Sequence, residues 1–505
     1  MNIKKLSSFL FQRSVIVALL ILLQAVVLLI PMVWASNYYV YVYWACVVLS
    51  LLAVLVIVRR QTDPGYKIAW IIPILLFPMF GWLVYLLCGG NKLSARMRRK
   101  MQGVDHTMVE QLERDYKAEK LVSFGADAVN QARYLELYAR CPVYTNTWTQ
   151  YFPLGDHVFP VMLEELKRAE RYIFLEYFII GPGVFWDSIV EILKEKHAAG
   201  VDVRIIYDDV GSLNTLPMNY AKKFEADRFK PVISIRMNNR DHRKFCIIDG
   251  HTAFTGGINL ADEYINREMR FGHWKDSAIL VKGEAAWSMT VMFLTMWEYV
   301  REVKVDYAAL RPAGLPREAQ LGSGYFVQPY TDNPLDNEAV GETVYLNLIS
   351  KAERYVYIMT PYLIISDCVN TALCNAAKSG VDVRIMTPHI PDKPLVFEVT
   401  RAHYEQLLEA GVRIFEYTPG FVHAKNVVVD DRYAVVGSIN MDYRSMFLHF
   451  EDAVLLYRDP TVLDVKADFL NTQIKCQPVT LEQCLERSWA RRLFRSLLRV
   501  LSPLL

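Results

Sequence analysis

A pattern of histidine, lysine and aspartate occurs twice in this chain of 505 residues, with the same spacing each time. The first copy is His242-x-Lys244-x4-Asp249, and the second is His423-x-Lys425-x4-Asp430. Lysine donates hydrogen bonds to phosphate oxygens, while histidine can attack phosphorus or donate a proton. Two histidines and two lysines therefore predict a two-part site for phosphoryl transfer, and phosphodiester chemistry is the leading hypothesis.

Each copy is followed at the same distance by two small residues and an asparagine. These are Gly256, Gly257 and Asn259 in the first copy and Gly437, Ser438 and Asn440 in the second. Small residues let the backbone approach a ligand closely, and an asparagine amide is a neutral donor. We therefore predict that Gly257, Ser438, Asn259 and Asn440 bind phosphate.

The motifs need structural elements that hold them in place. Residues 242–249 and 423–430 are apolar between their polar ends, which predicts a buried strand in each copy. Side chains alternate along a strand, so a histidine and a lysine two positions apart point to the same face. We count Asp249 and Asp430 with the catalytic motif, although their place at the end of an apolar run favours holding the turn that follows.

The duplication extends upstream of the motifs. Residues 169–180 resemble residues 352–365, and residues 200–205 are repeated as 380–385. Within each half, apolar β-rich runs alternate with segments of helical periodicity, such as 185–199. The predicted fold class is α/β, with two tandem domains at residues 101–315 and 316–478.

The first hundred residues are strongly apolar and predict a membrane region over residues 1–100. Uncharged runs cover 14–34 and 37–58, each about the length of a bilayer-spanning helix. A third run, 68–88, has prolines and a glycine in its middle, and basic residues flank all three runs. Because basic flanks favour the cytoplasm, we predict two crossings, a re-entrant hairpin and cytoplasmic catalytic domains. Three crossings are the alternative, and a cleaved signal peptide is the alternative for the first run.

Composition bears on cofactors and partners. The eight cysteines form no C-x-x-C pair and no zinc-ligand spacing, which indicates a reducing compartment and no metal. No long basic stripe with interleaved aromatic residues supports nucleic-acid binding. The net charge of +2 identifies no partner, but basic residues cluster near the apolar runs and at the chain end, where anionic lipids would be met.

Residues 479–505 form a separate basic C-terminal segment. Within 489–505, leucines and aromatic residues fall on one helical face and four arginines on the other. This pattern predicts an amphipathic helix lying on anionic phospholipid. A helix packed on the protein's own surface or on the N-terminal hairpin is the alternative.

The paired motifs resemble the signature of the phospholipase D superfamily. Further likenesses are to bacterial cardiolipin synthases: residues 59–87 resemble their membrane-proximal N-terminal module, and residues 175–179, 239–244, 360–364 and 437–445 are also similar. The resemblance covers nearly the whole chain. An extra first apolar run, and Gly257 where the second copy has a serine, are departures.

The resemblance implies two phospholipase D-like domains related by a pseudo-two-fold axis, with both histidines facing one phosphate. One imidazole would attack the phosphorus of a phosphatidylglycerol, while the other protonates the departing glycerol. A second phosphatidylglycerol would then take the phosphatidyl group to give cardiolipin. We expect His242 as nucleophile and His423 as acid and base. The lysines and asparagines would hold the phosphate oxygens without a metal cofactor.

A nucleophilic histidine needs an acceptor on its other ring nitrogen. The resemblance assigns this role to Glu451, and the corresponding region of the first half offers Asp276. An ordinary salt bridge is the alternative for both. Glu176, at the end of a repeated strand, is a weaker candidate for lining the site.

Other functions share these motifs. Water in place of a lipid hydroxyl would make the protein a phospholipase D or a nuclease, and another alcohol would make a different phosphatidyltransferase. A non-catalytic lipid-binding scaffold is the remaining alternative, but both motifs are intact. The predicted partners are phosphatidylglycerol and anionic lipids of the bacterial cell membrane, without nucleic acid.

Overall fold

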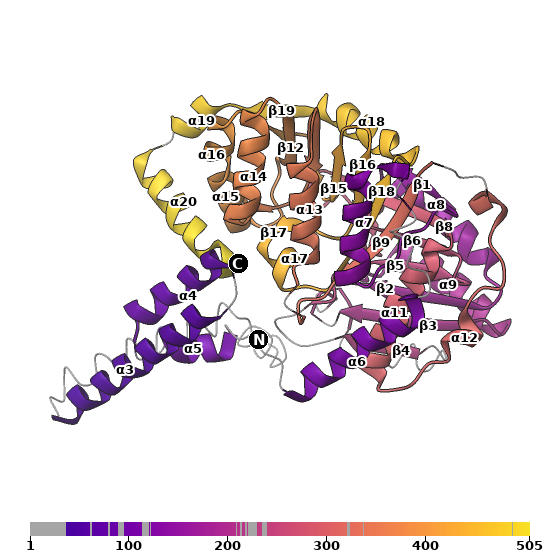
Figure 1. Ribbon diagram of the computed structural model, residues 1–505, viewed down its shortest axis with the longest axis horizontal. Helices are drawn as coiled ribbons and strands as arrows, with labels where there is room; N and C mark the ends of the chain where they lie inside the picture. The colour runs from indigo at the N-terminus through magenta and orange to yellow at the C-terminus, as the bar shows by residue number, and fades with distance from the viewer. Residues whose placement is uncertain are drawn as a thin grey trace. The chain divides into compact units, whose positions relative to one another are not determined.

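The computed structural model describes residues 37–60, 63–78, 81–88, 95–113, 121, 123–208, 210–212, 215–217, 220, 230–234, 240–320, 324–336, 338–486 and 488–504. The chain divides into two compact units (Figure 1). The smaller unit comprises Met1–Lys92 and Val500–Leu505, and the larger unit is Leu93–Arg499. The first predicted membrane run and Asn239 of the resembling segment 239–244 lie outside the described residues.

Three helices pack together in the smaller unit, namely α3 Asn37–Arg59, α4 Pro64–Leu76 and α5 Gly81–Cys88, with the short η5 Ser502–Leu504 against α4. α4 and α5 form an antiparallel hairpin in which the rings of Trp70 and Tyr85 lie 5.2 Å apart. Gly81 approaches α4 so closely that a Cβ there would lie 2.5 Å from the Cα of Ile74. The third apolar run therefore folds as a helical hairpin, and its re-entry into a bilayer stays a prediction.

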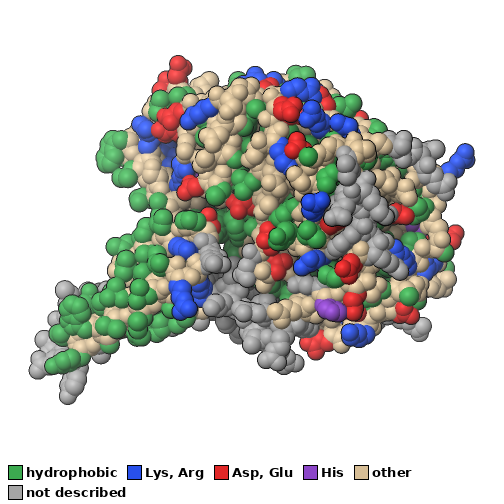
Figure 2. All heavy atoms as spheres, in the orientation of Figure 1, with side chains coloured by type: hydrophobic (Ala, Val, Ile, Leu, Met, Phe, Trp, Pro, Cys, Tyr) green, Lys and Arg blue, Asp and Glu red, His purple; other side chains and the backbone are tan. Residues whose placement is uncertain are grey.

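The second predicted crossing coincides with α3. Most of its large apolar side chains are exposed, and Figure 2 shows hydrophobic side chains gathered along this helix. Judged by length and apolarity, no helix in the described part of the chain qualifies as membrane-spanning.

The first half of the larger unit is built on a seven-stranded mixed sheet in the order β1-β8-β6-β5-β2-β3-β4. β2, β3 and β4 are parallel, and the other neighbours are antiparallel. The strands are β1 Thr147–Phe152, β2 Tyr172–Tyr177, β3 Asp202–Asp208, β4 Lys230–Ser234, β5 Phe245–Ile248, β6 Thr252–Gly256 and β8 Ala278–Gly283. Every residue of β2, β5, β6 and β8 is buried, as expected for strands covered on both faces.

The second half repeats this topology in an eight-stranded sheet, β19-β13-β12-β10-β15-β16-β18-β9. The parallel strands β10, β12 and β13 correspond to β2, β3 and β4 of the first sheet. The antiparallel strands β15, β16, β18 and β9 correspond to β5, β6, β8 and β1. An additional strand, β19, pairs with β13 at the edge. The strands are β9 Phe326–Asp332, β10 Tyr355–Met359, β12 Asp382–Pro388, β13 Arg413–Tyr417, β15 Asn426–Val429, β16 Tyr433–Gly437, β18 Glu451–Tyr457 and β19 Cys476–Val479. Two tandem α/β domains are thus confirmed.

Helices cover the sheets of both halves (Figure 1). Those of the first half are α6 Ala95–Leu112, α7 Ala126–Tyr138, α8 Gly155–Arg168, α9 Val184–Ala198, α11 Ala285–Arg301, α12 Tyr307–Leu310, η3 Asp262–Ile265 and η4 Arg317–Gln320. Those of the second half are α13 Val340–Ser350, α14 Asp367–Lys378, α15 Pro394–Ala402, α16 Tyr404–Glu409, α17 Tyr443–Phe447, α18 Thr461–Gln473, α19 Leu481–Leu485 and α20 Trp489–Leu501. α9 confirms the helix predicted over 185–199.

One hydrophobic core joins the two halves. α11 is buried around nearly its whole circumference and contacts β8 of the first half and β9 of the second. β16 and β18 also contact β6. Because the core is continuous, the halves hold each other's loops at fixed positions.

The C-terminal helix α20 confirms the predicted amphipathic helix. Its arginines lie on α15 and α16, where Arg491 and Arg495 pair with Glu398 at 2.6 and 2.8 Å and Arg492 pairs with Glu405 at 2.8 Å. Its apolar side chains Trp489, Leu493, Phe494 and Leu497 are exposed by 48–77%. The cationic face is therefore turned to the protein, as in the alternative considered above, and the apolar face is the free one.

Candidate active site

The histidine of each motif lies in a segment that pairs with the opposite half. His242 N–H donates to the carbonyl of Phe450 at 2.9 Å, beside a bridge between Asp241 and Phe450. In the second copy, β14 Gly420–Val422 pairs with β7 His273–Lys275, and His423 N–H donates to the carbonyl of Lys275 at 2.7 Å. β5 and β15 begin only after the motif lysines. Placing histidine and lysine on these strands was wrong, because the histidine backbone bonds to the other half.

Each motif histidine is held by a carboxylate of the opposite half. Nδ1 of His242 lies 2.9 Å from both carboxylate oxygens of Glu451, and Nδ1 of His423 lies 2.6 Å from Oδ2 of Asp276. Both carboxylates are fully buried. A carboxylate only accepts, so Nδ1 carries the proton and Nε2 keeps its lone pair. Nε2 is therefore the atom that each histidine offers to an electrophile.

Asp276 and Glu451 occupy equivalent positions in the two sheets. Each stands two residues before an alanine that pairs with the glycine of the motif turn; these pairs are Gly256–Ala278 and Gly437–Ala453. The sequence predicts both carboxylates but not that each binds the histidine of the other half. No local pattern encodes that exchange, because it depends on how the halves pack.

The small residues of the two turns support these carboxylates. Ser438 Oγ donates to Glu451 Oε2 at 2.5 Å and accepts from the N–H of Asp452 at 2.9 Å. A Cβ at Gly257 would lie 2.0 Å from Asp276 Oδ1, so glycine leaves room for that carboxylate. These roles differ from the predicted phosphate contacts, because the serine hydroxyl is already committed to Glu451 and the space beside Gly257 is filled by Asp276.

Both motif lysines are buried and bend back toward their histidines. Each Nζ donates to the carbonyl oxygen of the histidine two positions earlier, and Lys425 Nζ also lies 2.8 Å from His423 Nδ1. Burial lowers the pKa of Lys425 to about 7, although Asp276 opposes this. Burial also lowers the pKa of Lys244, although the negative charges of Glu451 and Asp452 act to raise it. The site thus holds two buried ammonium groups, and the pKa of Lys425 lies near neutrality.

Both motif histidines are neutral in this environment. Burial, followed by the charges of Lys244 and Lys425, holds the pKa of His242 well below its ordinary value. Burial and the charge of Lys425 lower the pKa of His423 to about 4, with Asp276 opposing. A proton on His423 would lower the pKa of His242 further, so the two motif histidines are close enough to affect each other's protonation.

The motif aspartates lie at the far ends of the motif strands. Asp249 accepts from the backbone N–H groups of Glu170, Arg171 and Tyr172, each at 2.8 Å. Asp430 binds the equivalent amides of residues 353–355 at 2.7–2.8 Å. Both carboxylates anchor the start of the neighbouring strand, β2 or β10. The prediction that these aspartates belong to the catalytic groups is therefore corrected. The prediction that they hold the turn that follows is corrected too, because their carboxylates bind the neighbouring strand.

The motif asparagines are buried and bonded within the protein. Asn259 accepts from the N–H of Ile179 at 3.0 Å and donates to Tyr264 Oη at 2.9 Å, while Asn440 donates to Ser445 Oγ at 3.0 Å. Their contact with phosphate stays a prediction.

Glu176, the weaker candidate for lining the site, pairs with the buried Arg243 of the first motif at 2.5 Å. This ion pair gives Glu176 a structural role.

Both halves of this site lie in regions that match a known protein family. A family model described as cardiolipin synthase, PLD-like domain, matches residues 162–297 and 345–472, which together include both motifs and both carboxylates. The chain belongs to the cardiolipin synthase family of phospholipase D-like proteins. A second model, described as phospholipase D-nuclease N-terminal, matches residues 48–90 and thus α4 and α5.

Several other proteins align with most of the chain. An uncharacterized protein of Streptococcus mutans is 41% identical over 465 residues, which are 90% of this chain and 99% of the relative. Cardiolipin synthases of Geobacillus kaustophilus and Halalkalibacterium halodurans are 35% and 33% identical, each over 89% of this chain and 91% of the relative. The fold is similar to that of a phosphatidylserine synthase of Haemophilus influenzae, with a TM-score of 0.55, 13% identity, and 71% of this chain and 95% of that chain covered. The predicted family is confirmed.

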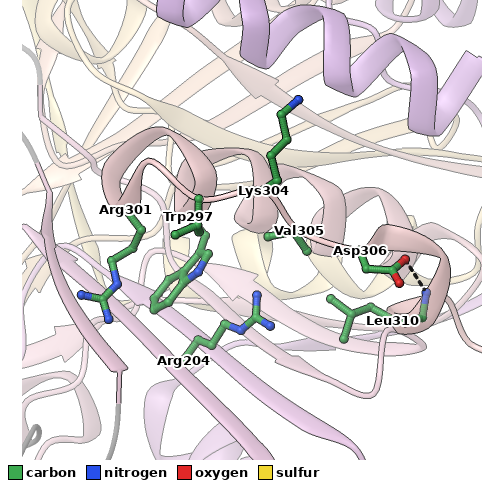
Figure 3. A pocket seen from close by; sticks show the side chains of 9 residues that line it. Arg204, Trp297, Arg301, Lys304, Val305, Asp306 and Leu310 are labelled. Atoms are coloured by element: carbon green, nitrogen blue, oxygen red, sulfur yellow. Dashed lines mark hydrogen bonds between the residues drawn. The ribbon is translucent and has the colours of Figure 1, made fainter.

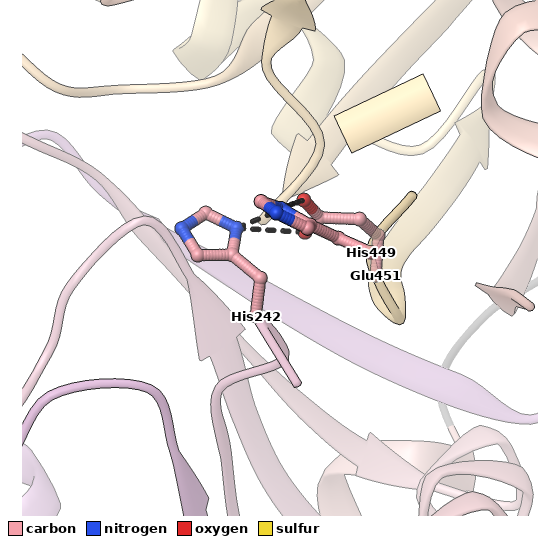
Figure 4. Close-up of side chains that lie close together, drawn as sticks. All are labelled: His242, His449 and Glu451. Atoms are coloured by element: carbon pink, nitrogen blue, oxygen red, sulfur yellow. Dashed lines mark hydrogen bonds and ion pairs between the residues drawn. The ribbon is translucent and has the colours of Figure 1, made fainter. Parts of the chain in front are cut away.

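A third histidine, His449, lies beside His242 and Glu451 (Figure 4) and was not among the residues predicted from the sequence. His449 is 9% exposed, its ring centroid is 5.7 Å from that of His242, and its Nδ1 lies 3.7 Å from Glu451 Oε1. Its position two residues before Glu451 is the only local signal that could have indicated it.

His242, His449 and Glu451 could in principle hold a metal ion, because their ligand atoms lie within 4.8 Å of one another. Two features oppose this. The charges of Lys244 and Lys425 already act on His242. Arg444 Nε lies 3.3 Å from His449 Nε2 and donates to it, which leaves the proton on Nδ1, the atom that faces Glu451. The group is therefore better suited to a hydrogen-bonded network.

A separate hollow of about 410 Å³ lies along α11 and α12 (Figure 3). Its lining includes Arg204 and Arg301, which lie over the ring of Trp297, and Lys304. Arg204 already pairs with Asp202 at 2.7 Å. None of the predicted site residues lines this hollow, so we assign it no part in the chemistry.

Proposed function

We propose that this protein is a cardiolipin synthase that transfers a phosphatidyl group from one phosphatidylglycerol to another. The observation that carries the proposal is that each of two buried histidines is bound by a carboxylate of the opposite half: His242 by Glu451, and His423 by Asp276. This pairing leaves two Nε2 atoms available in a site with two lysine side chains. Family membership supports the same conclusion.

In the first step, Nε2 of His242 attacks the phosphorus of a phosphatidylglycerol. The bond between phosphorus and the head-group glycerol oxygen breaks, and His423 gives that oxygen a proton. The products are free glycerol and a phosphatidyl group bound to His242. Glu451 stabilises the positive charge that the attacking imidazole acquires.

In the second step, a hydroxyl of another phosphatidylglycerol attacks the bound phosphatidyl group. His423, now neutral, takes the hydroxyl proton, and the bond between His242 and phosphorus breaks. Cardiolipin is released, and both histidines return to their starting states. Because His423 gives one proton to the departing glycerol and takes one from the incoming hydroxyl, the cycle needs no external acid or base.

Lys244 and Lys425 are suited to holding the non-bridging phosphate oxygens. Their ammonium groups are buried, so each interaction with a phosphate anion is stronger than it would be in water. The negative phosphate in turn favours protonation of the lysines and of His423. We infer that substrate binding supplies the protonated His423 that the first step needs.

A lipid hydroxyl is favoured over water as the acceptor. His242 and His423 are only 7% and 8% exposed, so little water reaches the histidines. Hydrolysis would give phosphatidic acid instead of cardiolipin, and another alcohol would give a different phospholipid.

The proposal includes anchoring in the bacterial cell membrane by the N-terminal hundred residues. It is supported by the apolar run 14–34, by the exposed apolar side chains of α3 and by the match of residues 48–90 to the N-terminal family model. The exposed apolar face of α20 provides a further surface for the lipid bilayer, since its arginines are already neutralised by the protein.

The test uses detergent-solubilised, full-length protein with phosphatidylglycerol radiolabelled in its phosphate as the only lipid. We expect labelled cardiolipin and an equal amount of free glycerol, unchanged by EDTA. Phosphatidic acid as the sole product would make the protein a phospholipase D, and loss of turnover in EDTA would contradict the metal-free site. The double variant His242→Gln/His423→Gln controls for contaminating activity.

A further inference from the structure

The two half-sites differ at one further pair of equivalent positions. Trp274 stands two residues before Asp276, and His449 stands two residues before Glu451, so the matched sheet registers make them counterparts. The Trp274 ring packs on His423 with centroids 5.4 Å apart, and the His449 ring packs beside His242. One half-site therefore has an indole where the other has a second imidazole.

The contacts of His449 fix which of its nitrogens carries the proton. Arg444 donates to Nε2 and always carries its own protons, so the neutral imidazole has its proton on Nδ1. Nδ1 lies 3.7 Å from Glu451 Oε1, which is beyond hydrogen-bond distance, and it is buried without a hydrogen-bond partner in the described part of the structure. Such contacts are often long in empty active sites and shorten when substrate binds. Burial also lowers the pKa of His449 to about 3, so the ring is a neutral donor.

Glu451 is then surrounded by three potential donors. His242 Nδ1 reaches both oxygens, Ser438 holds Oε2 and His449 faces Oε1. Once the His449 contact shortens to a hydrogen bond, donors on both oxygens keep the carboxylate from rotating away from the imidazole that it orients. Each donor also withdraws charge, which weakens the carboxylate as a proton acceptor.

We propose that His449 is a positioning residue for His242, acting through Glu451 by holding Oε1 while Ser438 holds Oε2. The inference rests on the proposed function, in which His242 is the nucleophile. It assigns His449 the task of keeping Nε2 of His242 directed at phosphorus. The half-site of His423 has no such residue, because Trp274 takes the equivalent position.

The test compares three variants of the full-length enzyme. His449→Phe keeps a ring but removes the donor, and His449→Asn keeps a short N–H donor. His251→Phe is the control, since this histidine lies in the turn between β5 and β6 and contacts Thr252. Melting temperatures are measured for all three, so that a folding defect is recognised.

We expect His449→Phe to lower kcat by about 10-fold with KM for phosphatidylglycerol unchanged, as for other residues that orient an active-site ligand. The acidic limb of its pH profile moves to higher pH, because a Glu451 with one donor fewer holds the His242 proton more tightly. His449→Asn restores kcat, and His251→Phe behaves as wild type. Wild-type kcat and an unmoved acidic limb in His449→Phe would overturn the proposal, and so would an Asn variant as impaired as the Phe variant.

A second readout does not depend on the reaction catalysed. In protein labelled with ¹⁵N-histidine, the Nδ1–H resonance of His242 is assigned by its loss in His242→Gln. We expect that resonance to shift in His449→Phe and to return toward its wild-type position in His449→Asn. If wild-type protein makes no cardiolipin, the proposed function fails, while an unchanged resonance in His449→Phe separately overturns the role of His449.

Discussion

At the scale of single residues, the two motif histidines must take opposite proton states for the proposed reaction, although both are neutral in the empty site. A bound phosphate provides a physical route. Nδ1 of His423 already donates to Asp276, so the added proton is carried by Nε2, the atom that faces the substrate. The negative charge of the phosphate raises the pKa of His423 and favours this protonated form.

The identity of the nucleophile can be read from a trapped intermediate. A phosphatidyl ester of nitrophenol needs no acid for its leaving group, so His423→Gln should still form the intermediate but resolve it slowly. We expect one equivalent of nitrophenol and phosphatidyl-labelled protein from His423→Gln, and neither from His242→Gln. Both variants should make cardiolipin about 1,000-fold more slowly than wild type. Labelled protein from His242→Gln instead would assign the nucleophile to His423.

The pH profile of kcat/KM should be bell-shaped. The acidic limb belongs to His242: burial and the charges of Lys244 and Lys425 lower its pKa, so activity falls only when the pH is low enough to protonate Nε2 of this nucleophile. The basic limb belongs to Lys425, whose pKa is lowered to about 7, so above that pH it loses the charge that holds the phosphate. Lys425→Arg should remove the basic limb, because guanidinium does not titrate there. A basic limb that persists in this variant would exclude Lys425 as its source.

At the scale of elements, the motif aspartates show how a strand is anchored rather than how a bond is broken. Asp249 and Asp430 both have positive φ values, 53° and 56°, which turn the chain so that each carboxylate meets three backbone N–H groups. These bonds tie the end of the motif strand to the start of its neighbour.

Asp249→Ala should therefore affect stability more than chemistry. Removing the acceptor leaves three backbone donors without it and should lower the free energy of unfolding of the larger unit by about 3 kcal/mol. Asp249→Asn, which tolerates the left-handed conformation and keeps an acceptor, should lose less. Chemical denaturation with kcat measured per folded molecule checks both points. A fully stable Asp249→Ala protein without turnover would return this aspartate to the catalytic groups.

At the scale of the whole molecule, the enzyme must present its site to a substrate that resides in a bilayer. The apolar face of α20 is suited to this task. Its arginines are paired with Glu398 and Glu405 on α15 and α16, so lipid contact would depend on hydrophobic burial more than on salt.

Replacing two leucines on this face should weaken use of the lipid without altering the chemistry. For Leu493→Ser/Leu497→Ser in proteoliposomes, we expect KM for phosphatidylglycerol to rise about 10-fold, as the loss of two partly inserted leucines suggests, with kcat retained. Leu463→Ser on α18 is the matched control, since Leu463 is 54% exposed and Leu493 is 52% exposed. Equal KM values for the double variant and the control would mean that α20 does not contact the bilayer.

The chemistry-bearing residues and the α/β duplication could be predicted from the sequence because both are local or repeated patterns. Paired motifs at constant offset identify His242, Lys244, His423 and Lys425, and alternating apolar runs indicate strands and helices. The hairpin of α4 and α5 follows in the same way from prolines and a glycine within one apolar run.

Only the tertiary structure decided which groups act on each other. Glu451 serves His242 and Asp276 serves His423 because strand segments pair across the halves, and such long-range pairing leaves no trace in sequence spacing. The same reason explains Ser438, which donates to Glu451 instead of facing phosphate. It also explains α20, whose sequence shows two faces, whereas carboxylates on α15 and α16 determine which face is covered.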